Sequence, residues 1–250
     1  MLVATGIARG FYGVQALTAA DLTVERGTVT GLIGPNGAGK TTMFNCLSGV
    51  VPPEGGTVTF EGVDVTGWRP EAIAQAGLVR TFQIARGFPS LTVLESLLLH
   101  GDRQPGEGLG AALLGRGRAR ERALVARAEG VAERLNLTPV LHAMSTELSG
   151  GQKKLLEIGR ALMGRPRLVL LDEPVAGVNP TLAIEIADRI AALRADGLTF
   201  LVVEHDMEIV KRLCDPVVVM AGGATLMQGS FADVVSDPRV QAAYLGTRVA

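Results

Sequence analysis

The apolar positions of this 250-residue chain alternate between short strand-like runs and longer helical patterns. Four short runs come first, and Gly and Thr separate them as in strands joined by tight turns: Leu2–Ile7, Leu22–Glu25, Val29–Ile33 and Thr57–Phe60. The third run leads directly into a glycine-rich loop, and Lys40–Ser48 after this loop is predicted to be a helix.

The stretch from Leu91 to Leu141 has a different pattern. Leu94, Leu97 and Leu98 predict one helix, and a Gly/Arg-rich stretch over 101–118 follows it. A second predicted helix carries apolar residues at helical spacing: Leu124, Ala128, Val131 and Leu135. We interpret this block as a helical subdomain inserted between two parts of an α/β core.

Strands and helices alternate again in the last third of the chain. The predicted elements are, in order, Leu168–Leu171, Pro180–Arg194, Leu198–Val203, Asp206–Leu213 and Val217–Met220. Strands that alternate with helices in this way predict a parallel sheet flanked by helices.

The composition is that of a globular protein, with 47% hydrophobic and 20% charged residues. A net charge of −1 gives no general signal for polyanion binding, so no nucleic-acid partner is predicted. Cys46 and Cys214 fit no disulfide framework and are predicted to be buried free thiols of a reducing cytoplasm. No signal peptide is apparent, and the apolar runs are far below the roughly 18 residues of a membrane span. We therefore expect a soluble chain that reaches a membrane only through a partner.

A glycine loop supplies the first chemical signal. The stretch Gly34-Pro35-Asn36-Gly37-Ala38-Gly39-Lys40-Thr41 fits the pattern G-x-x-x-x-G-K-[ST]. Glycines allow successive backbone N–H groups to converge on phosphate oxygens, which side chains would obstruct. Lys40 would place its charge between the β- and γ-phosphates, and the Thr41 hydroxyl could ligate Mg²⁺. The loop predicts binding of a nucleoside triphosphate.

Two acids end the apolar strand Leu168–Leu171. Asp172 at the strand tip is well placed to hold Mg²⁺ through water, and Glu173 could polarise an attacking water as general base. A solvated acidic turn after a buried strand is the simpler interpretation, and the glycine loop makes it the weaker one.

The pentapeptide Leu148-Ser149-Gly150-Gly151-Gln152 precedes a predicted helix over Lys153–Met163. Free N–H groups and the positive end of the helix dipole would make this position an anion site. The alternative is that Ser149 is a plain N-cap and Gly150-Gly151 a turn. Because the chain already has one phosphate loop, a second anion site suggests a nucleotide shared between two copies of such a domain.

With these motifs in place, nearly the whole chain resembles the nucleotide-binding subunits of ABC transporters. In that family, ATP lies between the glycine loop of one subunit and the LSGGQ signature of another. The resemblance makes Gly34–Thr42 the Walker A motif, including Thr42, and Asp172 and Glu173 the Walker B acids. It makes Ser149–Gln152 the signature.

The resemblance also assigns Gln83 and His205. Gln83, in Arg80-Thr81-Phe82-Gln83, is similar to the glutamine that senses Mg²⁺ and contacts the membrane partner. His205 is similar to the switch histidine that touches the γ-phosphate. For the aromatic residue that stacks on adenine, the spacing favours Phe11, and the neighbouring Tyr12 remains an alternative.

One stretch departs from the family pattern. Where the D-loop usually carries Asp, this chain has Ala176-Gly177-Val178-Asn179-Pro180. Asn179 before Pro180 is also a good helix start, with Asn as N-cap. If Asn179 instead faces the partner's glycine loop, the missing charge should weaken communication between the two nucleotide sites.

Several segments further resemble the subgroup that serves uptake of branched-chain amino acids: Gly34–Thr42, Arg80–Gln83, Leu91–Val93, Ala176–Pro180, Glu204–Met207 and Ala243–Gly246. The lipopolysaccharide-export ATPase usually keeps Asp in the D-loop and ranks second, and importers of urea or amides remain open. A soluble ABC ATPase acting on DNA or ribosomes is less favoured, because no coiled coil, zinc module or second cassette is visible. The signature disfavours a P-loop kinase.

The resemblance implies an α/β P-loop NTPase core with a parallel sheet, an N-terminal antiparallel β subdomain and an inserted α-helical subdomain. One ABC ATPase domain is expected over 1–250, with about 1–90 and 160–250 as core and about 91–159 as helical subdomain. The expected cofactors are ATP and Mg²⁺. The expected partners are a second ABC ATPase subunit, identical or paralogous, transmembrane permease subunits and, indirectly, a solute-binding protein. Such a subunit would lie peripherally on the cytoplasmic face of the inner membrane, and the sequence does not name its cargo.

Overall fold

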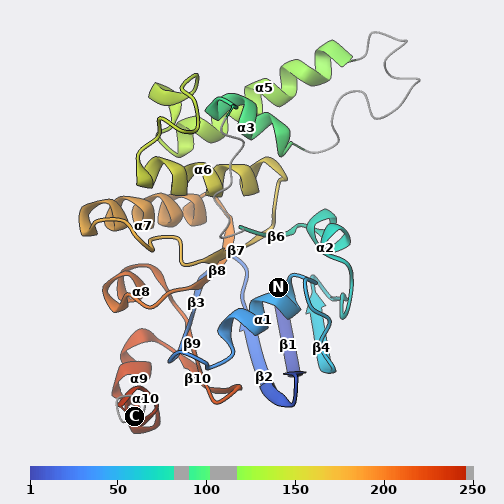
Figure 1. Cartoon of the computed structure of the whole chain (residues 1–250), viewed down its shortest axis with the longest axis vertical. Helices are drawn as coiled ribbons and strands as arrows, with labels where there is room; N and C mark the ends of the chain where they lie inside the picture. The colour runs from blue at the N-terminus through green and yellow to red at the C-terminus, as the bar shows by residue number, and fades with distance from the viewer. Residues whose placement is uncertain (82–89, 102–116, 246–250) are drawn as a thin grey trace. The chain divides into compact units, whose positions relative to one another are not determined.

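The computed structural model describes residues 1–81, 90–101 and 117–245 of the chain, which folds into two compact units (Figure 1). The first unit contains Met1–Arg80, Arg167–Pro174 and the chain from Ile190 onward. The second contains Thr81–Pro166 and Val175–Arg189. Gln83 lies outside the described residues.

An antiparallel sheet forms the start of the first unit, with the strand order β2-β1-β4-β5. Its strands are β1 (Leu2–Phe11), β2 (Val14–Val24), β4 (Gly55–Phe60) and β5 (Val63–Asp64). Leu2 pairs with Val24 on one side and with Phe60 on the other. Between β1 and β2, Tyr12 and Gly13 both have positive φ, the geometry of a tight hairpin turn. The predicted N-terminal antiparallel β subdomain is confirmed.

A second sheet in the same unit has the strand order β10-β9-β3-β8-β7-β6. Five strands run parallel, namely β3 (Val29–Ile33), β6 (Leu78–Arg80), β7 (Leu168–Asp172), β8 (Thr199–Val203) and β9 (Val217–Ala221). Strand β10 (Ala224–Gly229) joins β9 antiparallel. All five residues of β3 and of β8 are buried, as expected for parallel strands covered on both faces.

The glycine-loop helix α1 (Lys40–Leu47) belongs to a core that both sheets share. Met43, Phe44 and Leu47 of this helix are fully buried. They form one hydrophobic cluster with Leu2 and Ile7 of the antiparallel sheet and with residues of the parallel sheet: Leu32, Leu170, Leu201 and Val218. Burial of α1 between two sheets fixes the direction of its N-terminus and of the loop that precedes it.

The second unit is helical, as predicted. It holds α3 (Val93–Leu99), α5 (Gly117–Arg134), the 3₁₀ turn Thr138–Val140, α6 (Gly150–Met163) and the first part of α7 (Pro180–Ala195). Helices α3, α5 and α6 pack on one another. At Gly159 of α6, an added Cβ would lie 3.0 Å from a methyl of Leu97 and 3.1 Å from one of Leu135. A glycine at this position lets the helices approach closely.

Short helices complete the first unit: α2 (Pro70–Ala76), α8 (Met207–Leu213), α9 (Phe231–Ser236) and α10 (Pro238–Leu245). The sequence patterns gave no prediction for α2, α9, α10, β6 or β10. These elements have six to eight residues or, as strands, three and six, which is too short for a clear periodicity. Within the described part of the chain, no helix has the length and apolar character needed to cross a membrane.

Candidate functional site

The glycine loop connects a buried strand to the N-terminus of a helix. Gly34 has φ 151° and Gly39 has φ 99°, a region that L side chains rarely adopt. A Cβ on Gly34 would lie 2.2 Å from the carbonyl oxygen of Met220, and one on Gly39 would lie 2.6 Å from that of Ala16. Glycine is therefore required at both positions, because backbone carbonyl groups from other segments pack directly against them. At Gly37 no atom lies within 4 Å of a Cβ position, so this part of the loop is open.

Lys40 occupies the first residue of α1 and folds back over the loop. Its Nζ donates to the carbonyl oxygens of Gly34 at 2.7 Å and of Pro35 at 3.0 Å. Burial lowers the pKa of Lys40, and the negative charges of Glu173 and Asp172 partly oppose this shift. The ammonium thus lies in the field of both acids at the rim of the loop, where it can neutralise a bound polyphosphate.

Asp172, Glu173 and His205 come together at the carboxyl ends of two adjacent parallel strands. Asp172 of β7 pairs with Val203 of β8, and the backbone N–H of Glu173 donates to the Val203 carbonyl at 3.0 Å. His205 Nδ1 lies 3.7 Å from Glu173 Oε1. The His205 side chain is 67% exposed and that of Glu173 34%, so both can meet a ligand that arrives from solvent. Carboxyl ends of parallel strands are the usual place for ligands in open α/β sheets.

Glu173 has a strained backbone, with φ 49°. A residue with a side chain in the left-handed region costs of order 1–3 kcal/mol when the surrounding structure imposes it, and such residues cluster at functional sites. The turn directs the Glu173 side chain toward His205 rather than along the strand. Sequence patterns give no sign of this strain.

A buried arginine that the sequence analysis did not single out lies against Asp172. Arg80 Nη2 donates to Asp172 Oδ2 at 2.9 Å, and both side chains are almost fully buried. The sequence carried no clear signal for this contact, because the strand that carries Arg80, β6, is three residues long and escaped prediction.

The donor chemistry of this site suits Mg²⁺. The described residues contain no group of three or more His, Cys, Asp or Glu side chains that would bind a metal by themselves. Mg²⁺ at phosphate sites is commonly held through one or two carboxylates together with substrate phosphates. The carboxylate of Asp172 and the exposed Thr41 at the start of α1 are oxygen donors of this kind. We find that the residues fit the metal when a polyphosphate completes its ligands.

Phe11 and Tyr12 differ in their surroundings. The guanidinium carbon of Arg9 lies 5.0 Å from the centroid of the Phe11 ring. Tyr12, at the tip of the β1–β2 hairpin, is fully exposed. One face of Phe11 is therefore already occupied by a cation, whereas the Tyr12 ring is free for stacking.

Helix α6 begins inside the pentapeptide that contains Ser149. It starts at Gly150, three residues before the predicted start at Lys153. Ser149 and Gln152 form a capping box, in which the Gln152 N–H donates to Ser149 Oγ at 3.3 Å and the Ser149 N–H to Gln152 Oε1 at 2.9 Å. Helix geometry leaves the N–H groups of Gly150 and Gly151 without partners inside the helix. No atom lies within 4 Å of a Cβ position on Gly150, so this N-terminus is open to a ligand.

Asn179 is the N-cap of α7, as one of its two interpretations predicts. Its Oδ1 accepts a hydrogen bond from the Leu182 N–H at 2.9 Å, and Pro180 is the first residue of the helix. The side-chain oxygen that an aspartate would present is thus engaged within its own helix end.

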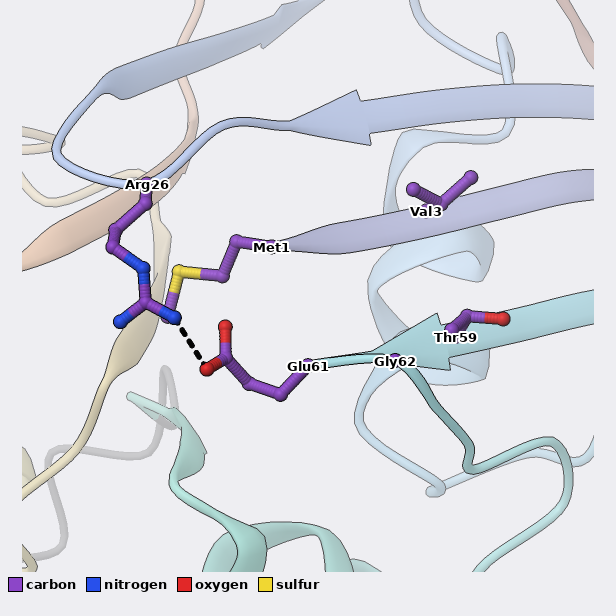
Figure 2. Close-up of a pocket in the computed structure, with 6 residues that line it drawn as sticks. All are labelled: Met1, Val3, Arg26, Thr59, Glu61 and Gly62. Carbon is purple, nitrogen blue, oxygen red and sulfur yellow. Dashed lines mark hydrogen bonds and ion pairs between the residues drawn. The ribbon is translucent and has the colours of Figure 1, made fainter.

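A concave surface site elsewhere in the first unit contains none of the predicted site residues. Figure 2 shows its lining by Met1, Val3, Arg26, Thr59, Glu61 and Gly62. The Glu61 carboxylate pairs with Arg26 and lies 3.5 Å from Arg167. Its charges are paired with one another, which gives this site a structural explanation.

The C-terminal helix α10 also reaches the glycine loop. Burial raises the pKa of Tyr244 to about 12, and a hydrogen bond with the backbone of Gly34 opposes this rise. Tyr244 was noted in the sequence only as part of the ending Ala243–Gly246.

Comparisons with known proteins agree with this geometry. Residues 17–176, more than half of the chain, match the model of the ABC transporter family, and residues 224–250 match that of the branched-chain amino acid ATP-binding cassette transporter. The probable branched-chain amino acid transport ATP-binding protein LivG of Archaeoglobus fulgidus is 39% identical over 99% of this chain and 96% of its own. The high-affinity branched-chain amino acid transport ATP-binding protein BraF of Pseudomonas aeruginosa is 39% identical over 98% of both chains.

Solved structures give the same result. A nucleotide-free ATP-binding cassette from an ABC transporter superposes with a TM-score of 0.85 at 38% identity, over 98% of both chains. The ADP conformation of an ATP-binding cassette of an ABC transporter superposes with a TM-score of 0.86 at 37% identity, again over 98% of both chains. The predicted α/β P-loop fold is confirmed.

Proposed function

Because this chain belongs to the ABC transporter family, we propose that it binds ATP with Mg²⁺ and hydrolyses it to power the uptake of branched-chain amino acids. The near-complete match to ATP-binding proteins of branched-chain amino acid transport carries this proposal. The match at residues 224–250 supports the same cargo class, because the matched model describes branched-chain amino acid ATP-binding cassette transporters.

The residues at the strand ends have distinct roles in hydrolysis. Glu173 is the general base that polarises the attacking water, and His205, 3.7 Å from it, contacts the γ-phosphate. Lys40 and the N–H groups of the loop Gly34–Thr42, including Asn36, bind the phosphates. Thr41 and Asp172 would hold Mg²⁺, together with Gln83. When bound, the metal neutralises charge on the phosphates.

ATP is bound between two subunits. The open N-terminus of α6 at Ser149–Gln152 meets the γ-phosphate held by the glycine loop of a second subunit, identical or paralogous. The open surroundings of Gly150 at the start of α6 support this role. A single subunit should therefore be a poor ATPase, and closure of the pair transmits force to its partners.

Tyr12 stacks on the adenine. Its ring is fully exposed at a hairpin tip, while Phe11 lies under Arg9, so exposure favours Tyr12 over the choice made from spacing.

The membrane partners are permease subunits, and a solute-binding protein acts with them indirectly. The subunit lies peripherally on the cytoplasmic face of the membrane, as expected of a transport ATP-binding protein that docks on permease subunits. The cargo is recognised by the permease and the binding protein.

The test is uptake of radiolabelled leucine by cells in which the gene for this chain is deleted. Expression of the wild-type chain should restore uptake, and the Lys40→Ala variant should not. Uptake of lysine serves as the control and should be unaffected by the deletion. Normal leucine uptake in the deletion strain, or loss of outer-membrane lipopolysaccharide instead, would show that the chain serves another transporter.

A further inference from the structure

Arg80 is a buried arginine whose charge is matched by the carboxylate proposed to hold Mg²⁺. Arg80 Nη2 lies 2.9 Å from Asp172 Oδ2, and the two side chains expose only 10% and 7% of their surface. Arg80 ends β6 and pairs with Leu170 of β7, so the arginine and the aspartate lie at the same edge of the sheet. Asp172, the proposed metal ligand, therefore has Arg80 as a positively charged partner within the protein.

Two residues of α1, together with Ser48 directly after the helix, hold the same guanidinium independently of Asp172. Nη1 donates to Asn45 Oδ1 at 2.6 Å and lies 3.4 Å from Ser48 Oγ. The guanidinium carbon lies 5.6 Å from the centroid of the buried Phe44 ring. Neutral oxygens and an aromatic face stabilise a cation without neutralising it. The arginine can therefore keep its position when Asp172 takes another partner.

Lys40 does not replace Arg80 as the partner of Asp172. Its ammonium donates to the carbonyl oxygens of Gly34 and Pro35, which keeps it at the loop proposed to bind phosphates. The ion pair that the structure gives Asp172 is the one with Arg80. Lys40 and Arg80 thus have different partners. Lys40 lies at the loop proposed to bind phosphates, and Arg80 lies at the proposed metal ligand.

A purely structural explanation of this ion pair is weak. Taking two charges out of water costs more than their attraction often returns, and apolar residues of similar volume could join β6 to β7 as well. A role as counter-ion of Asp172 explains why a charged residue, Arg80, stands at this position. Arg80 holds the Asp172 carboxylate in place when no metal is bound, and a metal can displace it.

We propose that Arg80 is a positioning residue that serves as the internal counter-ion of Asp172 and competes with Mg²⁺ for its carboxylate. This inference rests on the proposed function, in which Asp172 is a metal ligand. The consequence is that the site binds the divalent cation more weakly than an unpaired carboxylate would.

The experiment is a titration of Mn²⁺ into the full chain saturated with ADP, with free Mn²⁺ followed by electron paramagnetic resonance against a blank of ADP alone. Arg80→Met should bind Mn²⁺ roughly three- to tenfold more tightly, because a nearby positive charge is removed. Arg80→Lys, which keeps the charge, should stay within about twofold of the wild type. The control is Arg160→Met, which removes another half-buried arginine, one that lies beside Ser96 and Glu157, and should leave the Mn²⁺ affinity unchanged.

Unchanged or weaker Mn²⁺ binding by Arg80→Met would overturn the counter-ion role, provided that Asp172→Asn still weakens binding. If Asp172→Asn has no effect, the metal site of the proposed function is wrong, which separates the two failures. Should Arg80→Met not fold, Arg80→Gln replaces it with the same expectation, because it keeps donors for Asn45 without the charge. Thermal unfolding of each variant verifies folding before titration.

Discussion

His205 Nδ1 lies 3.7 Å from Oε1 of Glu173, with both residues at the ends of adjacent parallel strands. The strained backbone of Glu173, at φ 49°, turns its side chain toward the histidine. The distance between the two atoms is too long for a hydrogen bond, and both side chains are open to solvent, so a water or a phosphate oxygen can contact both from the solvent side. A general base must be positioned by its neighbours and must still be able to accept a proton from water, and this arrangement allows both.

Glu173→Gln should lower the rate of ATP hydrolysis by about 10²- to 10⁴-fold, because the amide cannot accept the proton of the attacking water. ATP binding should persist, since the glycine loop is unchanged. The measurements are phosphate release and the ATP-dependent shift from monomer to dimer in size-exclusion chromatography. A variant that stayed monomeric with ATP and hydrolysed it normally would show that Glu173 is not the base.

Tyr12→Ala should weaken ATP binding about tenfold, as expected from the loss of one base-stacking contact. The thermal stability should not change, because the Tyr12 side chain makes no buried contact. Phe11→Ala is the matched control, and its larger effect should be on stability, since the Phe11 ring packs under Arg9. Calorimetric titration with ATP distinguishes them. The opposite order of ATP affinities would assign the adenine contact to Phe11.

Asn179→Ala should lower the free energy of unfolding by about 1 kcal/mol, because α7 loses its N-cap. Asn179→Asp should leave stability nearly unchanged, since Asp caps a helix as well as Asn does. Urea unfolding measures both effects.

Asn179→Asp also tests communication between the two nucleotide sites. If the side chain faces the partner's glycine loop, the added charge should change the cooperativity of ATPase activity in the dimer. An unchanged rate and Hill coefficient would leave Asn179 with a capping role alone.

Stability should fall at alkaline pH because of the two buried thiols. Burial raises the pKa of Cys46 from 9.0 to about 11 and that of Cys214 from 9.0 to about 12. Unfolded thiols lose their protons at lower pH than folded ones. The contribution of the two buried thiols to the free energy of unfolding is therefore complete below pH 9 and is lost as the pH rises toward 11 and 12. Unfolding midpoints between pH 8 and 11 measure the slope, and the Cys46→Ala/Cys214→Ala variant should have a shallower one. Equal slopes would indicate that other groups dominate.

The same burial should make both thiols unreactive in the native state. Thiolate is the reactive form, and a raised pKa leaves almost none of it near pH 8. Absence of reaction with a disulfide reagent before unfolding, and two equivalents after it, is the expected outcome for Cys46 and Cys214.

The sequence by itself determined the features that depend on local order. The strand Val29–Ile33, the glycine loop and α1 follow one another along the chain, so their pattern identifies them without reference to the rest. The acids after β7 are identified in the same way. The helical subdomain was also predictable, because its helices carry regular apolar spacing.

Only the tertiary structure decided which residues from distant segments meet. Arg80 and Asp172 are far apart in sequence, and their contact depends on a three-residue strand with no periodicity of its own. The hydrogen bond between Gly34 and Tyr244, the exposure of Tyr12 and the strain at Glu173 are likewise set by how sheets, turns and helices pack. Local patterns encode which element forms, whereas pairings across the fold depend on the register of strands and the packing of the core. The sequence therefore indicated the glycine loop and the acids after β7, and the structure added the contact of Arg80 with Asp172 and that of His205 with Glu173.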